Sequence, residues 1–448
     1  DDSQYAPSDG VPATVSGQEM NPLTYTGKIG DTYNYATNPK APEGYVLVGT
    51  SPNLKGTFSR SDHDAYIYVK IDRNGAKATI KNLTHLNHAQ KQAAEAAIDQ
   101  ATDLNTMNQA TSTATTLDGD MGKLSDLTAD LTNTNNYKYA SDTPKSTVST
   151  DYTNADVLLD KDDKTAGQNA DDATVLKLID QINTHKSSLD GDTNLSAAKT
   201  TISGLTHLND AQRSAANQAV TNASDLTGLK TAVGNAQSVD SAMSDLQTAV
   251  NQANEAKTTN NYLQASADKQ DNLNSAVQNA QAVLAATGTN DSANQVKALT
   301  KSVNDAVDAL NGDSNLANTK NQADQKIDQM TNLSADQKKA AKDKITSANT
   351  SSDVTKAEND AQTLNDNLGK LNQAISAANS AKSTPNYKEA DSGQQTALDD
   401  ALSEAEKAKN SNDPSAVATA TKHLQDAQSG LNGDSNLANT KNQADQKI

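Results

Sequence analysis

The sequence of 448 residues contains no cysteine, no tryptophan and a single phenylalanine, Phe58. The absence of cysteine excludes a disulfide scaffold, a cysteine-ligated zinc site and cysteine-based catalysis. Leu, Ile, Val and Phe together number 68, about 15% of the chain, whereas folded soluble proteins rarely fall below roughly 20%. One large hydrophobic core is therefore excluded, and taken alone this composition points toward disorder.

Positive charge and long apolar runs are also scarce. The 38 Lys and Arg residues face 56 Asp and Glu residues, which gives a formal net charge of −18. This balance argues against a nucleic-acid binder or an anionic-membrane binder, because both need a basic face. No apolar run is long enough to cross a bilayer, so we expect no membrane insertion in this segment. No signal peptide or cell-wall anchor is visible, which suggests a piece of a longer protein.

Proline and tyrosine are concentrated at the N-terminus. Residues 1–72 hold six of the nine prolines and seven of the twelve tyrosines. Within 20–72 the pattern predicts a small β domain, and 1–19 is expected to be a linker or an incomplete strand. The predicted strands are Thr24–Thr26, Tyr33–Tyr35, Gly44–Gly49 and Ala65–Ile71.

The remainder of the chain is an internal repeat. The 18 residues Leu310–Ile327 recur unchanged as Leu431–Ile448, 121 residues later. A related segment, Leu189–Leu195, stands 121 residues before the first copy. Such a fixed period is the signature of a repeat architecture. The helical repeats are predicted at 73–188, 189–309 and 310–430, followed by the start of a truncated fourth repeat at 431–448.

Each repeat carries apolar residues at helical spacing. The stripe from Leu226 to Ala253 advances in steps of three or four, and similar stripes run from Val354 to Ala378 and over 104–131. A helix of ~30 residues would be ~45 Å long, which exceeds the length of one small bundle. Each repeat is therefore predicted to form two consecutive three-helix bundles that share the long helix.

Helix boundaries are marked by polar caps, prolines and glycines. Ser334 and Gln337 form a capping box, and Asn209 with Gln212 is expected to cap the matching helix. Helices that start with proline in the first position are predicted at Thr143-Pro144 and Asp413-Pro414. Glycines expected to stop helices are Gly191, Gly312 and Gly433. After Gly312, Asp313 or Ser314 is expected to cap the next helix.

Two stretches resemble known families. Residues 20–72 contain YTGKIGDTYNY, PEGYVLVG and LKGTFSRSDHDAYIYVKI, and they resemble a mucin-binding (MucBP) repeat of lactic-acid-bacterial surface proteins. The repeats resemble the alternating GA and FIVAR modules of giant Gram-positive surface adhesins, such as the staphylococcal matrix-binding adhesins. The residues that carry this second resemblance are Asn194–Val220 and an Asn-Tyr loop followed by two helices.

These resemblances imply a fold, a location and partners. The implied fold class is mainly α, with tandem three-helix bundles in an elongated rod, preceded by a small β-rich, β-grasp-like domain. The implied location is extracellular, on the bacterial cell surface, with cell-wall anchoring through a region outside this chain. The implied partners are host mucin or glycan, or an extracellular matrix or serum protein. Some GA modules bind albumin, and FIVAR arrays have been linked to fibronectin. The rod is expected to be monomeric.

Histidines and acidic residues offer few candidate sites. His85 and His88 share a helix entry and in principle suit a metal, but the matching residues elsewhere differ. Those residues are His207 with Asp210 in the second repeat and Asn332 with Ala335 in the third. We therefore expect a capping or surface role, as for the remaining histidines, His63, His185 and His423. The acidic clusters Asp118/Asp120 and Asp160/Asp162/Asp163 lack the spacing of a calcium loop and are expected to be solvated surface.

The tyrosines permit two interpretations. Tyr137, Tyr262 and Tyr387 recur every 125 residues in the Asn-Tyr loop. They form either a stacking platform for a glycan or one aromatic anchor for each bundle. In the β domain, a second set provides either a glycan-contacting face or core packing. This second set consists of Tyr35, Tyr45, Tyr66 and Tyr68.

No nucleophile motif, phosphate loop or metal-ligand set is present in the sequence. We therefore expect no enzyme activity, no cofactor, no metal and no catalytic residue, and no ligand-binding residue is assigned. The sequence predicts a non-catalytic cell-surface adhesin fragment in which the β domain contacts mucin or glycan and the helical array is a stalk. Two alternatives stay open: the helical modules bind albumin, fibronectin or another matrix protein directly, or the chain is an accessory region of an extracellular enzyme.

Overall fold

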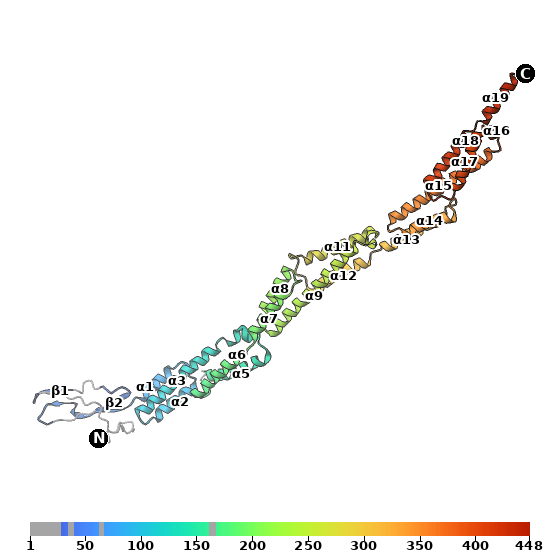
Figure 1. Ribbon diagram of the computed structural model, residues 1–448. Helices are drawn as coiled ribbons and strands as arrows, with labels where there is room; N and C mark the ends of the chain where they lie inside the picture. Colours follow the sequence, from blue (N-terminus) through green and yellow to red (C-terminus); the bar gives the residue numbers. More distant parts are fainter. Residues whose placement is uncertain (1–27, 35–39, 62–66, 161–166) are drawn as a thin grey trace. The chain divides into compact units, whose positions relative to one another are not determined.

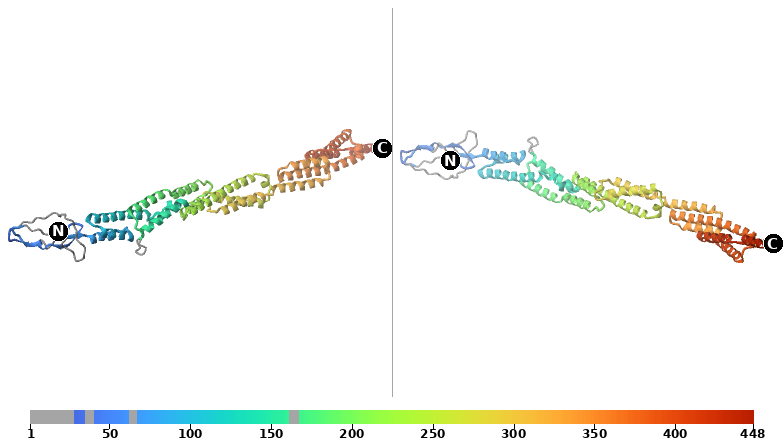
Figure 2. Two further views of the ribbon diagram at one scale, coloured as in Figure 1. Left: turned by 90° about the horizontal axis from the view of Figure 1, so that it is seen from below. Right: turned by 90° about the horizontal axis from the view of Figure 1, so that it is seen from above.

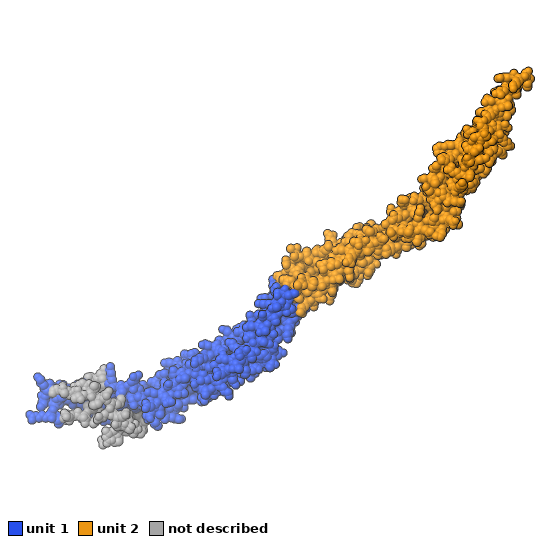
Figure 3. Space-filling view, viewed as in Figure 1, with its two compact units in different colours: residues 1–204, 217–234 blue, residues 205–216, 235–448 orange. Residues whose placement is uncertain are grey.

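The computed structural model describes residues 28–34, 40–61, 67–160 and 167–448. The chain divides into two compact units (Figure 3), one comprising 1–204 with 217–234 and the other 205–216 with 235–448. Several predicted features lie outside the described residues. These are the 1–19 segment, the strand Thr24–Thr26, and the residues Tyr35, His63, Tyr66, Asp162 and Asp163.

The described strands form two antiparallel pairs. Strand β1 (Thr32–Asn34) pairs with β3 (Lys55–Thr57), and β2 (Tyr45–Thr50) pairs with β4 (Ile67–Ile71). In the described residues β1, β2 and β4 coincide with predicted strands. Strand β3 was not predicted because its sequence, Lys-Gly-Thr, has little β propensity and gains its place only through pairing.

The β-rich part leads directly into the first helix, α1 (Arg73–Asn82). The Asp72 carboxylate caps α1 by accepting from the Gly75 N–H at 2.8 Å, while the Asp72 N–H donates to the Gly44 carbonyl at 2.9 Å. The Arg73 guanidinium donates to the carbonyl of Ala101, at the end of the next helix, at 2.6 Å. One cap thus connects the strand pair to the helical part.

In the first unit one long helix serves two bundles. The start of α3 packs with α1 and α2, and its later part packs with α5 and α6. We call the bundle that contains the start of the long helix the leading bundle and the next one the trailing bundle. The remaining elements are α2 (His88–Gln100), α3 (Leu104–Thr128), η3 (Leu131–Asn133), α4 (Asn135–Lys138), α5 (Asp142–Leu159), α6 (Asp172–Ser187) and α7 (Gly191–Gly204).

The second unit repeats this plan around α15. That helix packs with α13 and α14 and, further along, with α17 and α18, and these helices lie side by side in Figure 1 and in Figure 2. Helices α8 (Asp210–Asn222) and α9 (Leu226–Ala256) each contribute residues to both units. The others are α10 (Asn260–Leu263), α11 (Ala267–Leu284), α12 (Ala293–Asp308), α13 (Gly312–Asp328), α14 (Ala335–Ser347), α15 (Ser351–Ala381), α16 (Pro385–Lys388), α17 (Ser392–Ala408), α18 (Pro414–Ser429) and α19 (Gly433–Asp445).

The cores are thin seams of Leu, Ile, Val and Ala. In the first unit Ile80, Ile98, Leu124 and Ile182 are fully buried, and alanines such as Ala114 fill the positions between the larger side chains. The low content of large apolar residues is therefore compatible with folding, because each bundle needs only one narrow seam. The mainly α fold built of three-helix bundles is confirmed.

The long shared helices agree with the predicted stripes in two cases and differ in one. Helices α9 and α15 each have 31 residues, whereas α3 has 25 and ends at Thr128. The Thr128 hydroxyl donates to the carbonyls of Leu124 and Ser125, and Thr111 makes the same kind of bond inside α3, so this bond does not explain why α3 ends there. Leu131, predicted within the same helix, is buried in the short η3 turn instead.

The two prolines behave differently. Pro414 is the first residue of α18, and the Asp413 carboxylate accepts from the Ser415 N–H at 2.8 Å, as predicted. The start predicted at Thr143-Pro144 is wrong, because α5 begins at Asp142. Pro144 lies within the first turn, where an N–H would have no helical partner in any case.

The prediction that glycines stop the helices is wrong. Helix α12 ends at Asp308 with Ala309 as its C-cap, and Gly312 is the first residue of α13. Among the described glycines, positive φ occurs at Gly30, Gly44 and Gly167 and not at Gly312. The reason for glycine at this position therefore lies in its surroundings.

Candidate functional site

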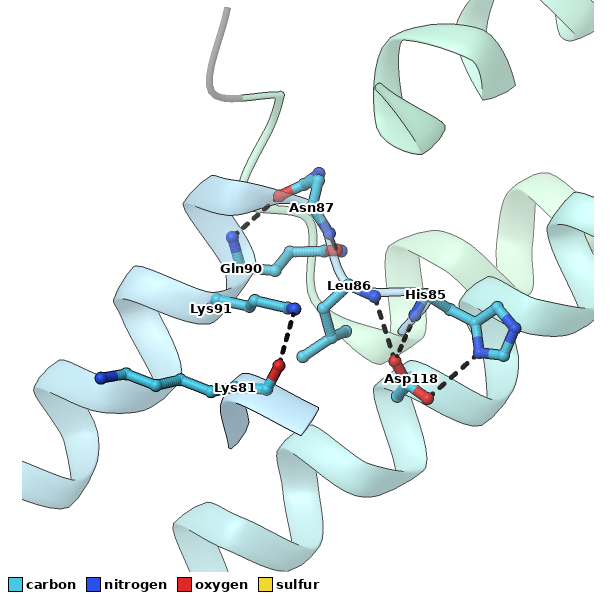
Figure 4. Close-up of polar contacts among 7 residues, drawn as sticks. All are labelled: Lys81, His85, Leu86, Asn87, Gln90, Lys91 and Asp118. Carbon is cyan, nitrogen blue, oxygen red and sulfur yellow. Dashed lines mark hydrogen bonds and ion pairs between the residues drawn. The ribbon is translucent and has the colours of Figure 1, made fainter. Parts of the chain in front are cut away.

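The contacts that the structure repeats are those that join successive bundles. In the first repeat, Asn87 precedes α2 and forms a capping box with Gln90 (Figure 4). The Asn87 Oδ1 accepts from the Gln90 N–H at 2.8 Å, and the Gln90 Oε1 accepts from the Asn87 N–H at 3.1 Å. The Asn87 and Gln90 side chains are 0% and 2% exposed, although asparagine and glutamine usually lie at the surface.

The amide groups of this cap reach the trailing bundle. The Asn87 Nδ2 donates to the carbonyls of Leu158 and Gln168, at 2.9 and 2.8 Å. The Gln90 Nε2 donates to the Ala170 carbonyl at 3.1 Å. The Leu158 carbonyl is in the last turn of α5, and the Gln168 and Ala170 carbonyls lie between α5 and α6. A helix cap of the leading bundle therefore satisfies backbone carbonyls of the trailing bundle. We call this set of contacts the cap junction.

The cap junction recurs in the other two repeats. In the second repeat Asn209 Nδ2 donates to the Val283 and Thr289 carbonyls, at 3.0 and 2.9 Å. Gln212 Nε2 donates to the Asp291 carbonyl at 3.1 Å. In the third repeat Ser334 caps the helix, and Gln337 alone donates to Lys409 and Ser411, at 2.9 and 2.8 Å. The predicted caps are confirmed, but their contacts with the trailing bundle were not predicted.

A second corner lies just before the cap. The backbone N–H groups of His85 and Leu86 donate to Asp118 Oδ1 at 2.7 and 3.0 Å, and His85 Nδ1 lies 3.1 Å from Asp118 Oδ2 (Figure 4). Burial raises the pKa of Asp118, but the hydrogen bonds from His85 and Leu86 outweigh it and lower the pKa. Asp118 therefore tethers the α1–α2 corner to α3 and is not a freely solvated acid.

This corner is kept in the other repeats with changing chemistry. His207 pairs with Asp240 through the same two contacts, at 2.8 and 3.1 Å. In the third repeat the Asn332 N–H donates to Asn365 Oδ1 at 3.0 Å. Within the described residues, no group of three or more His, Cys, Asp or Glu side chains is arranged to hold a metal. The histidines of this corner thus act as polar links between helices.

The other candidate residues lie apart from one another. Asp120 is buried and pairs with Lys123 at 2.6 Å, His88 bonds Gln92 at 2.9 Å, and Asp160 follows the end of α5. His185 pairs with Asp151 at 2.5 Å and His423 lies 3.5 Å from Glu404. Asp120 also shares a hydrogen bond with the Asp172 carboxyl. The contacts of His88, His185 and His423 lie in different bundles of the described residues, so they do not form one common site.

A different junction joins each trailing bundle to the next leading helix. In the first unit the Asp192 N–H donates to Asn136 Oδ1 at 3.1 Å, and Asn194 Nδ2 donates to the Tyr139 carbonyl at 3.0 Å. Gly191 lies against the backbone of α4, because a Cβ on Gly191 would stand 2.2 Å from the Asn136 carbonyl oxygen. We call this set of contacts the asparagine junction.

The asparagine junction also recurs. At the second junction the Asp313 N–H donates to Asn261 Oδ1 and Asn315 Nδ2 donates to the Gln264 carbonyl, both at 3.1 Å. At the third junction the Asp434 N–H donates to Asn386 Oδ1 at 2.9 Å, and Asn436 Nδ2 donates to the Glu389 carbonyl at 3.0 Å. A Cβ on Gly312 or Gly433 would also stand 2.2 Å from a carbonyl oxygen. The close approach of a neighbouring backbone carbonyl explains why glycine stands at these positions. The predicted caps Asp313 and Ser314 are wrong, because Asn261 of the neighbouring bundle accepts from the Asp313 N–H at the start of α13.

One acceptor of this junction differs between repeats. Asp190 accepts from the Ser141 hydroxyl at 2.6 Å and from the Ser141 N–H at 2.8 Å. The matching acceptors are amides, Asn311 for the Ser266 N–H and Asn432 for the Asp391 N–H, both at 3.0 Å. The hydroxyl and the N–H of Ser141 lower the pKa of Asp190. In the first asparagine junction the acceptor for Ser141 is thus a carboxylate, whereas in the third the carboxylate is that of Asp391, which accepts from Asn432 Nδ2 at 2.7 Å and from Asn436 Nδ2 at 3.1 Å.

The lowered pKa of Asp190 predicts that the contacts of Asp190 with Ser141 are sensitive to acid. Because the folded pKa of Asp190 is lowered, its contribution is complete above the ordinary value of 3.8 and disappears as the pH falls through the lowered value. Asp190→Asn is expected to flatten the decline in urea midpoint between about pH 4 and pH 2, and Asn311→Asp to steepen it. Indistinguishable midpoint-against-pH curves for the wild type and Asp190→Asn would contradict this assignment.

The tyrosines of the Asn-Tyr loop lie beside the asparagine junction. Tyr137, Tyr262 and Tyr387 are half-buried and pack against the cores of their trailing bundles. The carbonyls of Tyr262 and Tyr387 each accept from a glutamine amide at 2.7 Å. These contacts fit the interpretation as aromatic anchors, while a glycan-stacking role stays a prediction. In the strand pair, Tyr45 and Tyr68 are also half-buried, and their glycan-contacting role stays a prediction.

Tyr139 was not singled out from the sequence. It is 2% exposed, and its hydroxyl donates to the Ala223 carbonyl, after α8, at 3.0 Å. The matching residue Gln264 performs the equivalent task, accepting from the Ser351 N–H at the start of α15 at 3.0 Å. Because tyrosine and glutamine share no sequence pattern, comparison of the repeats gives no signal for this contact.

Comparison with known families follows the same division. The GA module matches 71–120, 192–242 and 313–367, and the FIVAR domain matches 120–190, 242–311 and 367–432. Residues 71–432 of the chain belong to the GA and FIVAR families, as an array of alternating modules. The boundaries from a GA module to the following FIVAR module fall inside α3, α9 and α15, the long helices that the two modules share. The predicted resemblance is confirmed for the helical part, and the mucin-binding resemblance of 20–72 stays a prediction.

Curated relatives come from staphylococci. The extracellular matrix-binding protein Ebh of Staphylococcus aureus strain MW2 is 35% identical over 176 residues, 38% of this chain. EbhA of strain Mu3 is 34% identical over 175 residues, also 38% of the chain. The match spans about 2% of the length of these relatives. The GA and FIVAR array is thus homologous to a short part of very long matrix-binding proteins.

Two solved structures are also similar in sequence. A crystal structure of residues 756–1003 of EbhA from S. aureus is 28% identical, covers 54% of this chain and 98% of that fragment, and has a TM-score of 0.43. A structure reported with Embp-mediated adherence of Staphylococcus epidermidis to fibronectin is 25% identical, covers 27% of this chain and 98% of that one, and has a TM-score of 0.26. Over the described part of this chain, no helix has the length and apolarity to span a bilayer.

Proposed function

We propose that this chain is a non-catalytic adhesive segment of a bacterial cell-surface protein. Its GA and FIVAR modules would present a matrix-binding surface and at the same time act as the stalk. The observation that carries this proposal is the recurrence of the cap junction and the asparagine junction between modules that match those of matrix-binding proteins. The units of the stalk would be the repeats 73–188, 189–309 and 310–430.

The junctions give the proposal its physical basis. Each bundle is small and has a thin core, so its stability depends on nearest-neighbour contacts, as in other repeat proteins. Buried amides at the cap junctions resist rotation of one bundle against the next, because rotation would leave backbone carbonyls without donors. The net charge of −18 disfavours lateral association of such segments. These properties suit a segment that carries a binding surface away from a cell wall.

The ligand of the proposed adhesin is a matrix protein. The support is the similarity to proteins named for extracellular matrix binding, together with a structure reported with adherence to fibronectin. We also propose that residues 20–72 bind mucin or glycan, and this part of the proposal rests on the sequence resemblance alone. The region that anchors the protein to the cell wall would lie outside this chain.

A binding experiment separates these possibilities. The full chain and a form lacking residues 1–72 are passed over immobilised fibronectin, serum albumin and mucin. We expect both forms to bind fibronectin alike, because the helical modules are present in both, and the shorter form to lose mucin binding. Absence of binding to all three surfaces at micromolar concentrations would contradict the adhesive role.

A further inference from the structure

The third FIVAR module has a hollow in its surface. The hollow lies between α15 and α18 and has a volume of about 520 Å³. Its lining includes the buried Ala374, the exposed Ala377 and Ala418, and lysine, glutamine, asparagine and threonine side chains. A volume of this size falls in the range of roughly 300–1,000 Å³ that ligand pockets occupy. The lining has no aromatic and no acidic residue.

Two small side chains explain why the hollow exists in this module. Helices α15 and α18 correspond residue by residue to α9 and α12 of the second repeat, at offsets of 125 and 121. At the matching positions the second repeat has Gln252 for Ala377 and Lys297 for Ala418. Where the second repeat has two long side chains, the third has two methyl groups. The backbones of the two helices follow the same arrangement in both repeats, so space is left between α15 and α18.

The charge at the rim also changes. Lys370, on α15, stands where the second repeat has Asp245, and within the described residues no ion pair is found for Lys370. Across the hollow, Lys422 on α18 pairs with Asp426 at 2.6 Å and is 72% exposed. The hollow is thus flanked by a cation on each helix, in a chain whose net charge is −18. The Asp426 carboxylate is the negative group that an incoming anion would displace from Lys422.

We propose that this hollow binds an acidic peptide segment of a protein partner. Carboxylates of the peptide would accept from the ammonium groups of Lys370 and Lys422. The amides of Gln373 and Gln425 would bond the peptide backbone, and the short side chains of the lining alanines would admit that backbone at close range. A peptide fits better than a sugar, because the lining offers no aromatic face for a sugar ring. This inference rests on the proposed adhesive function in taking the partner to be a protein.

The test uses the full chain and a fluorescent octapeptide of alternating Gly and Asp, with a Gly/Asn octapeptide as the neutral probe. Fluorescence anisotropy at low and high salt measures binding. We expect the acidic peptide to bind at low salt and to weaken with salt, and the neutral peptide not to bind. Lys370→Asp is expected to weaken binding at least tenfold. Equal binding of both peptides, or no binding of the acidic peptide at millimolar concentration, would overturn the proposal.

A double variant separates the shape of the hollow from its charge. Ala377→Gln with Ala418→Lys restores the second-repeat side chains, so it fills the hollow while adding a positive charge. If the acidic peptide binds in the hollow, its affinity for this variant is expected to fall at least tenfold. Tighter binding to the variant would show that charge alone attracts the peptide, and it would overturn the proposal. Far-UV circular dichroism and the thermal midpoint confirm that each variant is folded.

The reverse exchange offers a gain of function. Gln252→Ala, Lys297→Ala and Asp245→Lys together should create a second site and raise the stoichiometry of bound peptide from one to two. An unchanged stoichiometry in a folded variant would count against the proposal. Fibronectin binding is measured on the same variants. A wild-type chain that binds fibronectin but not the acidic peptide would overturn the peptide site alone, whereas a wild-type chain that binds the peptide but not fibronectin would overturn the adhesive function alone.

Discussion

Replacing Asn87 with alanine is expected to lower the free energy of unfolding of the first GA–FIVAR pair by about 3 kcal/mol. Loss of a helix cap costs about 1 kcal/mol. Leaving the buried carbonyls of Leu158 and Gln168 without their donor adds about 1–3 kcal/mol. Native-state hydrogen exchange of peptides from α2 and from the α5–α6 connection measures both consequences in one experiment.

A serine at the same position is the matched control. Ser334 occupies this position in the third repeat, where it caps the helix and Gln337 alone reaches the trailing bundle. Asn87→Ser is therefore expected to keep the cap and to recover about 1 kcal/mol of the loss. If Asn87→Ala changed the free energy of unfolding by less than about 0.5 kcal/mol, the range of ordinary surface substitutions, the cap junction would not couple the bundles.

Replacing Gly312 with alanine is expected to open the asparagine junction between the second FIVAR module and the third GA module. Alanine normally stabilises a helix relative to glycine by about 1 kcal/mol. Here its Cβ would stand 2.2 Å from the Asn261 carbonyl oxygen, so the backbone of α10 or α13 must move. We expect a net loss of about 2 kcal/mol, typical of overpacking against a fixed neighbour.

The opening is measured by exchange of the Asp313 N–H, which donates to Asn261 Oδ1 in the intact junction. The matched control is Gly234→Ala within α9, where a Cβ would meet no heavy atom within 4 Å. That control is expected to be neutral or stabilising by up to about 1 kcal/mol. Equal effects of the two substitutions would show that Gly312 is not held by close approach.

The helical plan could be predicted because it rests on local signals. Spacing of Leu, Val and Ala specified α9 and α15, and the polar patterns at Asn209 and Ser334 specified two helix starts. These signals are contained within one or two turns of the chain, and the threefold repetition allowed each to be checked against its copies. The thin core also follows from the composition once the spacing is known.

The junctions could not be predicted because their partners are distant in sequence. Asn87 looks like an ordinary cap, and only the fold places its amide beside carbonyls 71 and 81 residues away. Gly312 looks like a helix stop, and only the fold brings the Asn261 carbonyl against it. Tyr139 and Gln264 make equivalent contacts with different chemistry, so repeat comparison misses them as well. The sequence thus indicates modules and not the coupling between them.

The central claim is that the junctions couple each module to its neighbour within a unit, and small-angle X-ray scattering of the full chain is the most direct test of the rod that the sequence predicts. A compact globule of this length would have a radius of gyration of about 22 Å. Because each module contacts only its neighbours, we expect a radius more than roughly twice that value and a pair-distance distribution with the long tail of a rod. A radius near 22 Å with a symmetric distribution would contradict the account.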